Sequence, residues 1–132
     1  MSHELSKLRQ RLRRSYSALS RAFLTLQRTD PMVRGTFYLL RRKCGKPNCR
    51  CAQGTLHASW VLSRSEAGKD RLYTVPQAER VRVRFGAAEY RRHHQARALF
   101  VKRQAEVLAL ADEIARKRLR VWPAQKEKPP PS

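Results

Sequence analysis

The chain carries all three of its cysteines in one short segment, and this segment offers the clearest chemistry in the sequence. It reads C-G-K-P-N-C-R-C-A-Q-G-T-L-H and contains Cys44, Cys49, Cys51 and His57. Thiolates and imidazoles at about 2.3 and 2.0 Å are the ligands that proteins offer to zinc. The Gly-Lys-Pro-Asn between the first two cysteines favours a sharp chain reversal, which would bring both sulfurs to one point. The spacing therefore predicts a structural Zn²⁺ site with these four residues as ligands.

Other roles for the thiols stay open at this stage. His93 or His94 could replace His57 as the fourth ligand, with His3 a more remote candidate. The cysteines could be unligated, or form a redox pair, although the chain has no Cys-x-x-Cys. Plant-type iron–sulfur centres use four cysteines with a different spacing. The flanking lysines and arginines favour metallation, because positive charge lowers the pKa of a nearby thiol.

The charge of the chain is strongly one-sided. Its 132 residues include 30 Lys and Arg against 10 Asp and Glu, a formal net charge of +20 at pH 7. Such a charge opposes compaction unless an anionic partner neutralises it, and nucleic acid is the commonest partner of a small, very basic chain. An acidic membrane face, an acidic protein and a merely over-charged domain are the alternatives. We expect a nucleic-acid partner, DNA ahead of RNA, contacted through its phosphates.

The expected contact residues lie around the cysteines, along a predicted hairpin and in the segment after it. They are Arg41, Arg42, Lys43, Lys46, Arg50, Arg64, Lys69, Arg71, Arg80, Arg82 and Arg84. A two-stranded ribbon can enter a DNA major groove, so the hairpin could also read bases. The aromatic residues Phe37, Tyr38, Trp60 and Tyr73 are expected in the core of a sheet rather than as stacking platforms for bases.

The acidic residues argue against catalysis. Metal-dependent nucleases and transposases need several convergent carboxylates. Here Glu66 and Asp70 fall in a predicted turn, and Asp112 and Glu113 are neighbours that diverge on a helix. The chain also has no Gly-rich phosphate loop and no nucleophile elbow. We expect a binding module that is not an enzyme.

The pattern of apolar residues predicts an α+β fold. A first helix is expected over residues 2–28, because leucines and aromatics recur there at steps of three and four. Strands are expected over 36–40, 58–63 and 71–75, with a turn at 66–70 between the last two. These would form a small three-stranded antiparallel sheet. Helical residues follow to about 120, with an interruption expected near Phe85-Gly86.

The expected organisation has four parts. They are an N-terminal amphipathic basic helix (1–30), the sheet with the cysteine cluster (33–76), the C-terminal helices (77–121) and a disordered Pro-rich tail (122–132). The N-terminal and C-terminal helices are expected to pack as an antiparallel pair. The zinc knuckle would help to hold a sheet that has too little apolar surface of its own.

The first helix carries an apolar stripe, which we interpret as a seam against another helix. The stripe consists of Leu5, Leu8, Leu12, Tyr16, Leu19, Phe23 and Leu26. Two alternatives stay open. The helix could lie on a membrane surface, or the helix pair could dock a protein, which would make the chain an adaptor or a subunit of a ribonucleoprotein or other nucleic-acid complex.

The stretch from Gly35 to about Phe100 resembles a small uncharacterised prokaryotic domain with a C-G-K-P-x-C-x-C signature, often encoded beside or within transposase genes. The matching residues are Gly35-Thr36, Cys44 to Ala52, Gly54, His57, Gly68-Lys69 and Val75-Pro76. This chain has Ala58-Ser59-Trp60 where the family usually has Gly-Pro-Tyr. The resemblance implies a role accessory to a mobile element, with a transposase as one candidate protein partner, and it implies no reaction.

The sequence also bears on localisation. No run of apolar residues approaches the roughly 18 that span a membrane. Residues 1–29 lack the apolar region of a secretory signal, although their Arg- and Ser-rich composition would also suit an organellar presequence if the source were eukaryotic. An odd, clustered set of cysteines is unlike a secreted disulfide framework. We expect a cytoplasmic, nucleoid-associated protein with no membrane span.

Overall fold

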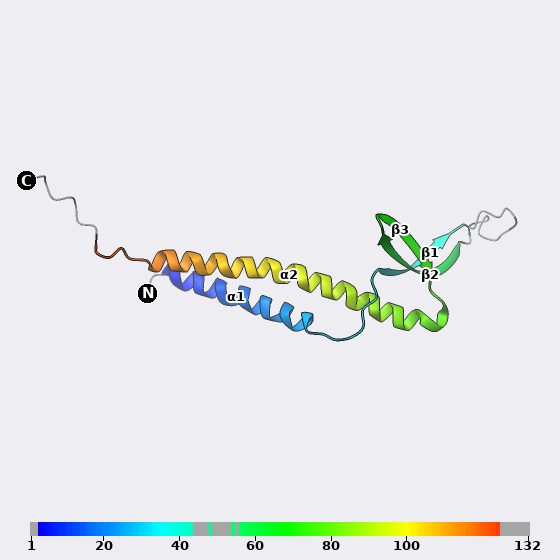
Figure 1. Cartoon of the computed structure of the whole chain (residues 1–132), viewed down its shortest axis with the longest axis horizontal. Helices are drawn as coiled ribbons and strands as arrows, with labels where there is room; N and C mark the ends of the chain where they lie inside the picture. Colours follow the sequence, from blue (N-terminus) through cyan, green and yellow to red (C-terminus); the bar gives the residue numbers. More distant parts are fainter. Residues whose placement is uncertain (1–2, 44–47, 49–53, 55, 125–132) are drawn as a thin grey trace, which may run out of the picture. The chain divides into compact units, whose positions relative to one another are not determined.

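The computed structural model describes residues 3–43, 48, 54 and 56–124, and these form two compact units (Figure 1). The helix-pair unit comprises Met1–Leu26 and Ala96–Ser132, and the sheet unit comprises Gln27–Gln95. The long helix α2 (Arg80–Arg118) contributes its first part to the sheet unit and its second part to the helix-pair unit. The net charge is divided evenly, since each unit has ten more Lys and Arg than Asp and Glu.

The sheet unit contains a three-stranded antiparallel sheet, as predicted. Its strands are β1 (Thr36–Arg42), β2 (His57–Glu66) and β3 (Lys69–Thr74), in the order β1-β2-β3. The turn between β2 and β3 has two central residues with positive φ, Ala67 at 50° and Gly68 at 79°. This is the turn geometry that matches the natural twist of a tight hairpin. The predicted α+β fold class with a three-stranded antiparallel sheet is therefore confirmed.

One face of the sheet packs against the first part of α2. The core consists of Leu62, Val75 and Ala87, with Val33, Phe37 and Val83 packed around them. The register places Phe37 opposite Leu62 and Leu39 opposite Trp60, so these four side chains share one face of the sheet. Phe37 and Trp60 stack with their ring centroids 4.9 Å apart. The core is small, which fits the modest apolar content of the chain.

The prediction of an interrupted C-terminal helix is wrong. After the short 3₁₀ helix η2 (Gln77–Glu79), α2 runs without a break from Arg80 to Arg118. Gly86 lies inside it because the chain at Val33 passes very close to the helix. A Cβ on Gly86 would lie 2.4 Å from Val33 Cγ2, and the Val33 amide donates a hydrogen bond of 2.9 Å to the Gly86 carbonyl. The glycine therefore permits a close approach and does not end the helix.

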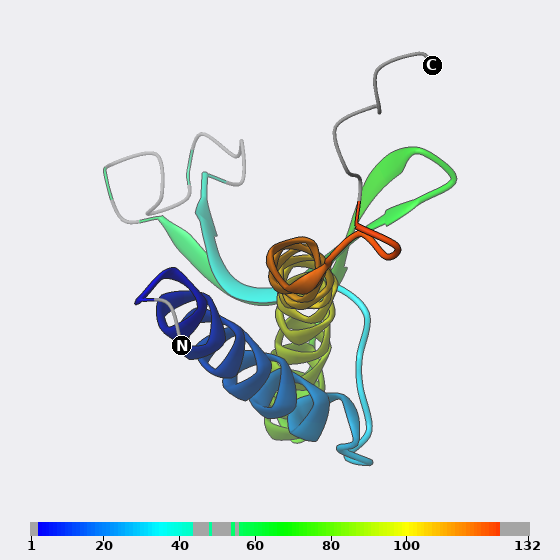
Figure 2. The same cartoon turned by 90° about the vertical axis from the view of Figure 1, so that its left-hand side faces the viewer.

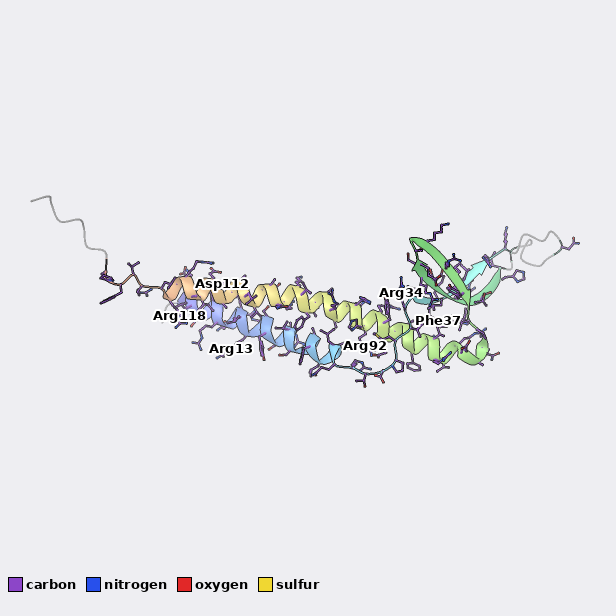
Figure 3. The ribbon with its side chains drawn as sticks, viewed as in Figure 1. Arg13, Arg34, Phe37, Arg92, Asp112 and Arg118 are labelled. Carbon is purple, nitrogen blue, oxygen red and sulfur yellow. The ribbon has the colours of Figure 1, made fainter. Side chains whose placement is uncertain are left out.

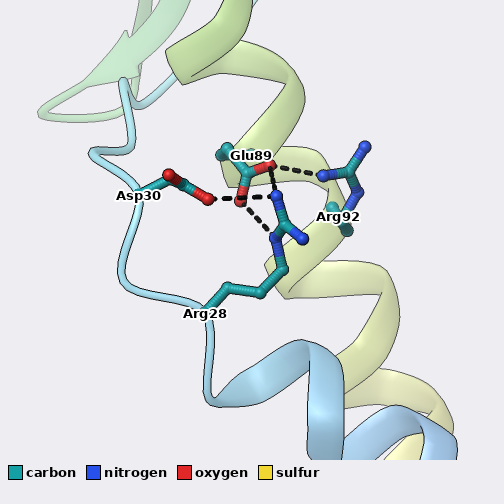
Figure 4. Close-up of polar contacts among 4 residues, drawn as sticks. All are labelled: Arg28, Asp30, Glu89 and Arg92. Carbon is teal, nitrogen blue, oxygen red and sulfur yellow. Dashed lines mark hydrogen bonds and ion pairs between the residues drawn. The ribbon is translucent and has the colours of Figure 1, made fainter.

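The segment that follows α1 (His3–Leu26) is fastened to α2 by a cluster of four charged residues (Figure 4). Arg28 donates to both carboxylate oxygens of Glu89, at 2.9 Å from Nε and 2.8 Å from Nη2, and it also contacts Asp30 at 3.0 Å. Arg92 donates to the same glutamate. The Glu89 side chain is only 12% exposed, and its hydrogen bonds with Arg28 hold the pKa of its carboxyl below the ordinary value.

The helix-pair unit consists of α1 and the second part of α2 in antiparallel arrangement, as predicted (Figure 2). Near one end of the pair, Lys117 Nζ lies 3.0 Å from Glu4 Oε2. Near the other end, the ring centroids of Phe23 and Phe100 are 6.5 Å apart. Between them the Ser15 hydroxyl donates to Glu106 at 2.9 Å. Lys117 holds the pKa of the Glu4 carboxyl below its ordinary value through its hydrogen bond.

The apolar stripe predicted for α1 is only partly buried. Ser15, Ala18 and Ala22 are buried together with Leu8, so small residues let the two helices approach closely. Tyr16 is 60% exposed, so its placement in the seam is wrong, and Phe23 is 49% exposed. Phe23 is half exposed but keeps its ring contact with Phe100 of α2, so it lies at the edge of the seam.

Neither α1 nor α2 nor any other helix among the described residues is long and apolar enough to cross a membrane.

Candidate nucleic-acid interface

Many cations have no acidic partner within the part of the chain that the structure describes. Most of the acids are already bound to a cation: Glu4 to Lys117, Asp30 and Glu89 to Arg28, Glu66 to Arg64 and Arg71, Glu79 to Arg82, Glu89 also to Arg92, and Glu106 to Arg103. The remaining arginines and lysines far outnumber the remaining acids. This excess is the main electrostatic feature of both units.

Three of the expected contact residues gather at the turn between β2 and β3. Arg64 and Arg71 are direct cross-strand neighbours, and both bind Glu66, at 2.6 and 3.4 Å. Tyr73 donates to Glu66 at 2.6 Å, and the Arg64 guanidinium lies 4.7 Å from the centre of the Tyr73 ring. The bonds from Tyr73 and Arg64 hold the pKa of the Glu66 carboxyl below its ordinary value. Lys69 lies opposite Glu66 in the register. Part of this charge therefore serves the hairpin itself.

A second group gathers where α2 begins. Arg80 and Arg84 line a small cavity of about 140 Å³ together with Phe37 and Trp60. The Arg84 guanidinium lies 5.8 Å from the centre of the Trp60 ring. Within the described part of the chain, the buried Nε of Arg80 has no hydrogen-bond acceptor. Two arginines thus flank an aromatic pair, which is an arrangement suited to anionic and planar groups.

The remaining expected contact residues are not part of these groups. Arg82 does not line the cavity beside the aromatic pair, and it binds Glu79. Arg41 and Arg42 end β1 on opposite faces of the sheet, and both are exposed, as is Lys43. Lys46 and Arg50 lie outside the described residues. Five of the expected contact residues that the structure describes therefore form two clusters, and the other four belong to neither.

The aromatic residues expected in the sheet core divide into two pairs. Phe37 and Trp60 are half-buried and stack on each other, as expected. Tyr38 and Tyr73 are 36% and 39% exposed, so these two lie outside the core. Tyr38 is on the sheet face opposite to Phe37, since the pleat of β1 alternates its side chains.

The predicted zinc ligands fall mostly outside the described residues. Cys44, Cys49 and Cys51 lie there, and His57 is the first residue of β2, where it is exposed. The described residues hold no cluster of three or more candidate metal ligands. The register pairs His57 with Arg42, so the end of β1 and the start of β2, which flank the cysteine segment, lie side by side. This hairpin base suits a closed set of ligands, and the zinc site stays a prediction.

His93 and His94, the alternative ligands, lie on α2. Their rings contact each other edge to face with centroids 5.3 Å apart, and His94 also contacts Tyr90 at 4.4 Å. His94 is exposed and His93 half-buried.

Sequence reasoning missed one basic cavity in the sheet unit. It has a volume of about 530 Å³, and its lining includes Arg34, Arg64, Tyr90, Arg91 and His94. The Arg34 guanidinium is held by a 2.5 Å hydrogen bond from Nη2 to the Ser65 carbonyl, and Figure 3 shows this side chain beside the sheet. Arg34 directly precedes Gly35, one of the residues that match the signature of the resembling family. Nothing in the sequence indicates that Arg34 and Arg91 lie close together.

A second basic cavity, of about 810 Å³, lies along the helix pair. It is lined by arginines from both helices: Arg11, Arg13, Arg14, Arg21 and Arg103. Ser15 and Arg103 both donate to Glu106 within it, and mainly the Arg103 bond holds the pKa of the Glu106 carboxyl below its ordinary value. The basic side of α1 was visible in the sequence, but the expected contact residues did not include it.

Comparison with known proteins places the chain in a family without assigning an activity. A family model described as a domain of unknown function (DUF6788) matches residues 2–84, which is more than half of the chain. No curated protein and no solved structure matched significantly. The matched span includes the whole of α1 and of the sheet, and it ends five residues into α2. The chain therefore belongs to the DUF6788 family of domains of unknown function.

Proposed function

We propose that the chain is a non-enzymatic nucleic-acid-binding module, with duplex DNA as its main partner. The observation that carries this proposal is the excess of arginine and lysine that the acids of the chain do not neutralise. A polyanion would release counterions from itself and relieve the repulsion among these cations, and both effects favour binding. Three of the acids, Glu66, Glu89 and Glu106, are each held by arginine, which favours a structural role for these carboxylates over a catalytic one.

We place the principal interface on the sheet unit. Arg80 and Arg84 beside Trp60 can bind phosphates, and the arginines at the hairpin turn add a second point of contact. Phosphate contacts of this kind fix the position of a duplex without reading its sequence. The same interface would also accept RNA, because the contacts are to the backbone.

The cysteine segment would serve this interface as a structural clasp. Zn²⁺ held by Cys44, Cys49, Cys51 and His57 would join the ends of β1 and β2 and keep Lys46 and Arg50 close to the same end of the sheet. The pairing of His57 with Arg42 supports this arrangement. The resemblance to a domain encoded beside transposase genes supports a role accessory to a mobile element in the cytoplasm.

Two matched triple variants test the location of the interface. The first changes Lys69, Arg80 and Arg84 to Gln in the two clusters of the sheet unit, and the second changes Arg13, Arg116 and Arg118 to Gln in the helix-pair unit. Each removes three positive charges, and none of the six residues has an acidic partner among those described. Binding to a fluorescent 20-bp duplex is measured by anisotropy over a range of salt concentrations.

The sheet-unit variant should lose most of the affinity, and the steepness of its salt dependence should fall by about 3, at roughly 0.9 per lost phosphate contact. The helix-pair variant should bind nearly as well as the unchanged chain. An equal loss in both variants would contradict the placement of the interface. Absence of duplex binding by the unchanged chain would contradict the function itself.

A second candidate function rests on the outer surface of the helix pair, which would dock a protein. Val101 and Leu108 lie seven residues apart on α2 and are 55% and 57% exposed, and Leu24 of α1 is 64% exposed. Changing Val101 and Leu108 to Gln should leave DNA binding intact if the first proposal holds alone. Loss of self-association or of a defined complex in native mass spectrometry would favour the adaptor function.

A further inference from the structure

The basic cavity lined by Arg34, Arg64 and Arg91 has the composition of a site for a single nucleotide. Neither the family description nor the proposed interface assigns a function to this cavity. Its volume of about 530 Å³ falls in the range of small-molecule sites, which is roughly 300–1,000 Å³. Three arginines line it, Arg34, Arg64 and Arg91, against one acid, Asp70. It draws these residues from the segment before β1, from both later strands and from α2.

Two of the three arginines are held in place by other contacts. Arg34 donates to the Ser65 carbonyl at 2.5 Å. Arg64 donates through Nε to Glu66 at 2.6 Å and lies over the Tyr73 ring. Arginines whose side chains are already ordered lose less conformational entropy when they bind an anion. Arg91 differs, since its side chain forms no hydrogen bond and no ion pair with the described residues, and it is exposed.

The backbone at the edge of the cavity depends on a glycine. Gly35 has φ of 132°, and a Cβ there would lie 2.8 Å from the Ser63 carbonyl oxygen. Gly35 and Ser63 both line the cavity, together with the hydroxyl-bearing Thr36 and Ser65. Hydroxyls beside arginines are suitable donors for phosphate oxygens.

The wall on α2 is aromatic. Tyr90 and His94 lie one helical turn apart, with ring centroids 4.4 Å apart and their planes inclined at 62°. Both residues line the cavity next to Arg91. Stacking on aromatic side chains is how proteins hold bases that are not paired in a duplex. A base inside a duplex presents no face to such a wall.

We propose that this cavity binds one unpaired nucleotide of a nucleic acid, with its phosphate at Arg34, Arg64 and Arg91 and its base against Tyr90 and His94. This inference rests on the proposed nucleic-acid binding and deepens it. The chain would bind duplex phosphates along its basic surface and hold an unpaired end or a displaced base in the cavity. A partly single-stranded DNA would then be preferred to a blunt duplex.

The first experiment uses the full-length chain and adenosine 5′-monophosphate, with inorganic phosphate and adenosine as separate probes, in isothermal titration calorimetry. The nucleotide should bind more tightly than either part alone. Arg91→Gln should weaken nucleotide binding by about tenfold, the effect of losing one charge-assisted hydrogen bond. Arg97→Gln is the matched control, because it removes the same charge from an exposed position of α2 outside the cavity. His94→Ala should weaken binding of the nucleotide more than binding of inorganic phosphate, so that the two affinities become more similar.

The outcomes are distinct. Equal weakening in Arg91→Gln and Arg97→Gln, or a nucleotide that binds no better than phosphate, would overturn the proposal. If circular dichroism shows that Arg91→Gln does not fold, the His94→Ala variant is used instead. An unchanged affinity of this variant for the nucleotide would then overturn the proposal. Retained duplex binding without any nucleotide binding would overturn the cavity while leaving the proposed function in place.

The second experiment asks whether the nucleotide belongs to a nucleic acid. Blunt 12-bp DNA is compared with the same duplex carrying a one-nucleotide 5′ overhang, again by anisotropy. The overhang should increase affinity several-fold in the unchanged chain and in Arg97→Gln, and not in Arg91→Gln. Equal affinity for both duplexes would overturn the proposal that the cavity binds an unpaired nucleotide of a nucleic acid. Nucleotide binding in calorimetry would then indicate a site for a free nucleotide.

Discussion

Replacing Gly86 by Ala should destabilise the sheet unit, although the same change stabilises most helices. At an unconstrained helical position Ala is favoured over Gly by about 1 kcal/mol. Here the added Cβ would meet Val33 at 2.4 Å from Cγ2, 2.9 Å from Cβ and 3.0 Å from the amide nitrogen. Two of these three distances are below any ordinary contact, so the chain at Val33 must move away from α2.

The magnitude follows from three effects. Overpacking of this kind costs about 1–3 kcal/mol, and displacement of Val33 weakens the 2.9 Å hydrogen bond from its amide to the Gly86 carbonyl, worth about 1 kcal/mol. Against these stands the helical preference of Ala, about 1 kcal/mol. We expect a net loss of about 2 kcal/mol in the free energy of unfolding, measured by urea denaturation with Trp60 fluorescence.

A double-mutant cycle provides the control. Val33→Ala removes the Cγ2 atom that would clash, so the double variant should lose less stability than the sum of the two single variants. Ala88→Gly, on an exposed position two residues further along α2, should cost about 1 kcal/mol and shows the ordinary helical preference. Stabilisation by Gly86→Ala would refute the close approach of Val33 to the helix.

The other predictions concern the turn, the acid response and the metal. Ala67→Asn should raise the free energy of unfolding by about 0.5–1 kcal/mol in urea denaturation, because Asn tolerates the positive φ of this turn position better than Ala. Arg28 lowers the pKa of Glu89, so the stability that this carboxylate contributes is present above its ordinary pKa of 4.5 and is lost as the pH falls through the lowered value. Urea midpoints between pH 6 and pH 3 should therefore fall less steeply in Glu89→Gln, and an unchanged slope would refute this role. Native mass spectrometry should find one zinc ion per chain that a chelator removes, with weaker retention in His57→Ala, whereas a zinc-replete preparation without metal would contradict the site.

Local patterns in the sequence were sufficient to predict the elements of the fold. The turn at Ala67-Gly68 and the alternating residues of β2 predicted the hairpin, and the spacing of Leu5, Leu8 and Leu12 predicted a helix that begins and ends within two residues of α1. These signals depend on neighbours in the chain. The exposure of Tyr16 did not follow from them, since it depends on which side of the leucine row faces the partner helix.

The errors concern contacts between residues distant in the sequence. Gly86 resembled a helix break because its packing partner, Val33, is more than fifty residues away. The cavity lined by Arg34 and Arg91 was invisible for the same reason. By contrast, the clusters at the hairpin turn and at the start of α2 contain residues that the charge pattern had already indicated. The register of β2 and β3 brings Arg64 and Arg71 together, and the helical spacing of α2 puts Arg80 and Arg84 on one face.

The most direct test of the proposed function is the salt dependence of binding to a fluorescent 20-bp duplex. An interface that neutralises about six phosphates should give a slope near −5 when the logarithm of the association constant is plotted against the logarithm of salt concentration. The chain should retain this slope when the duplex sequence is changed, because phosphates and not bases are contacted. An association constant that does not change with salt, or no measurable binding at about 50 mM salt, would contradict the proposal that this basic chain binds nucleic acid.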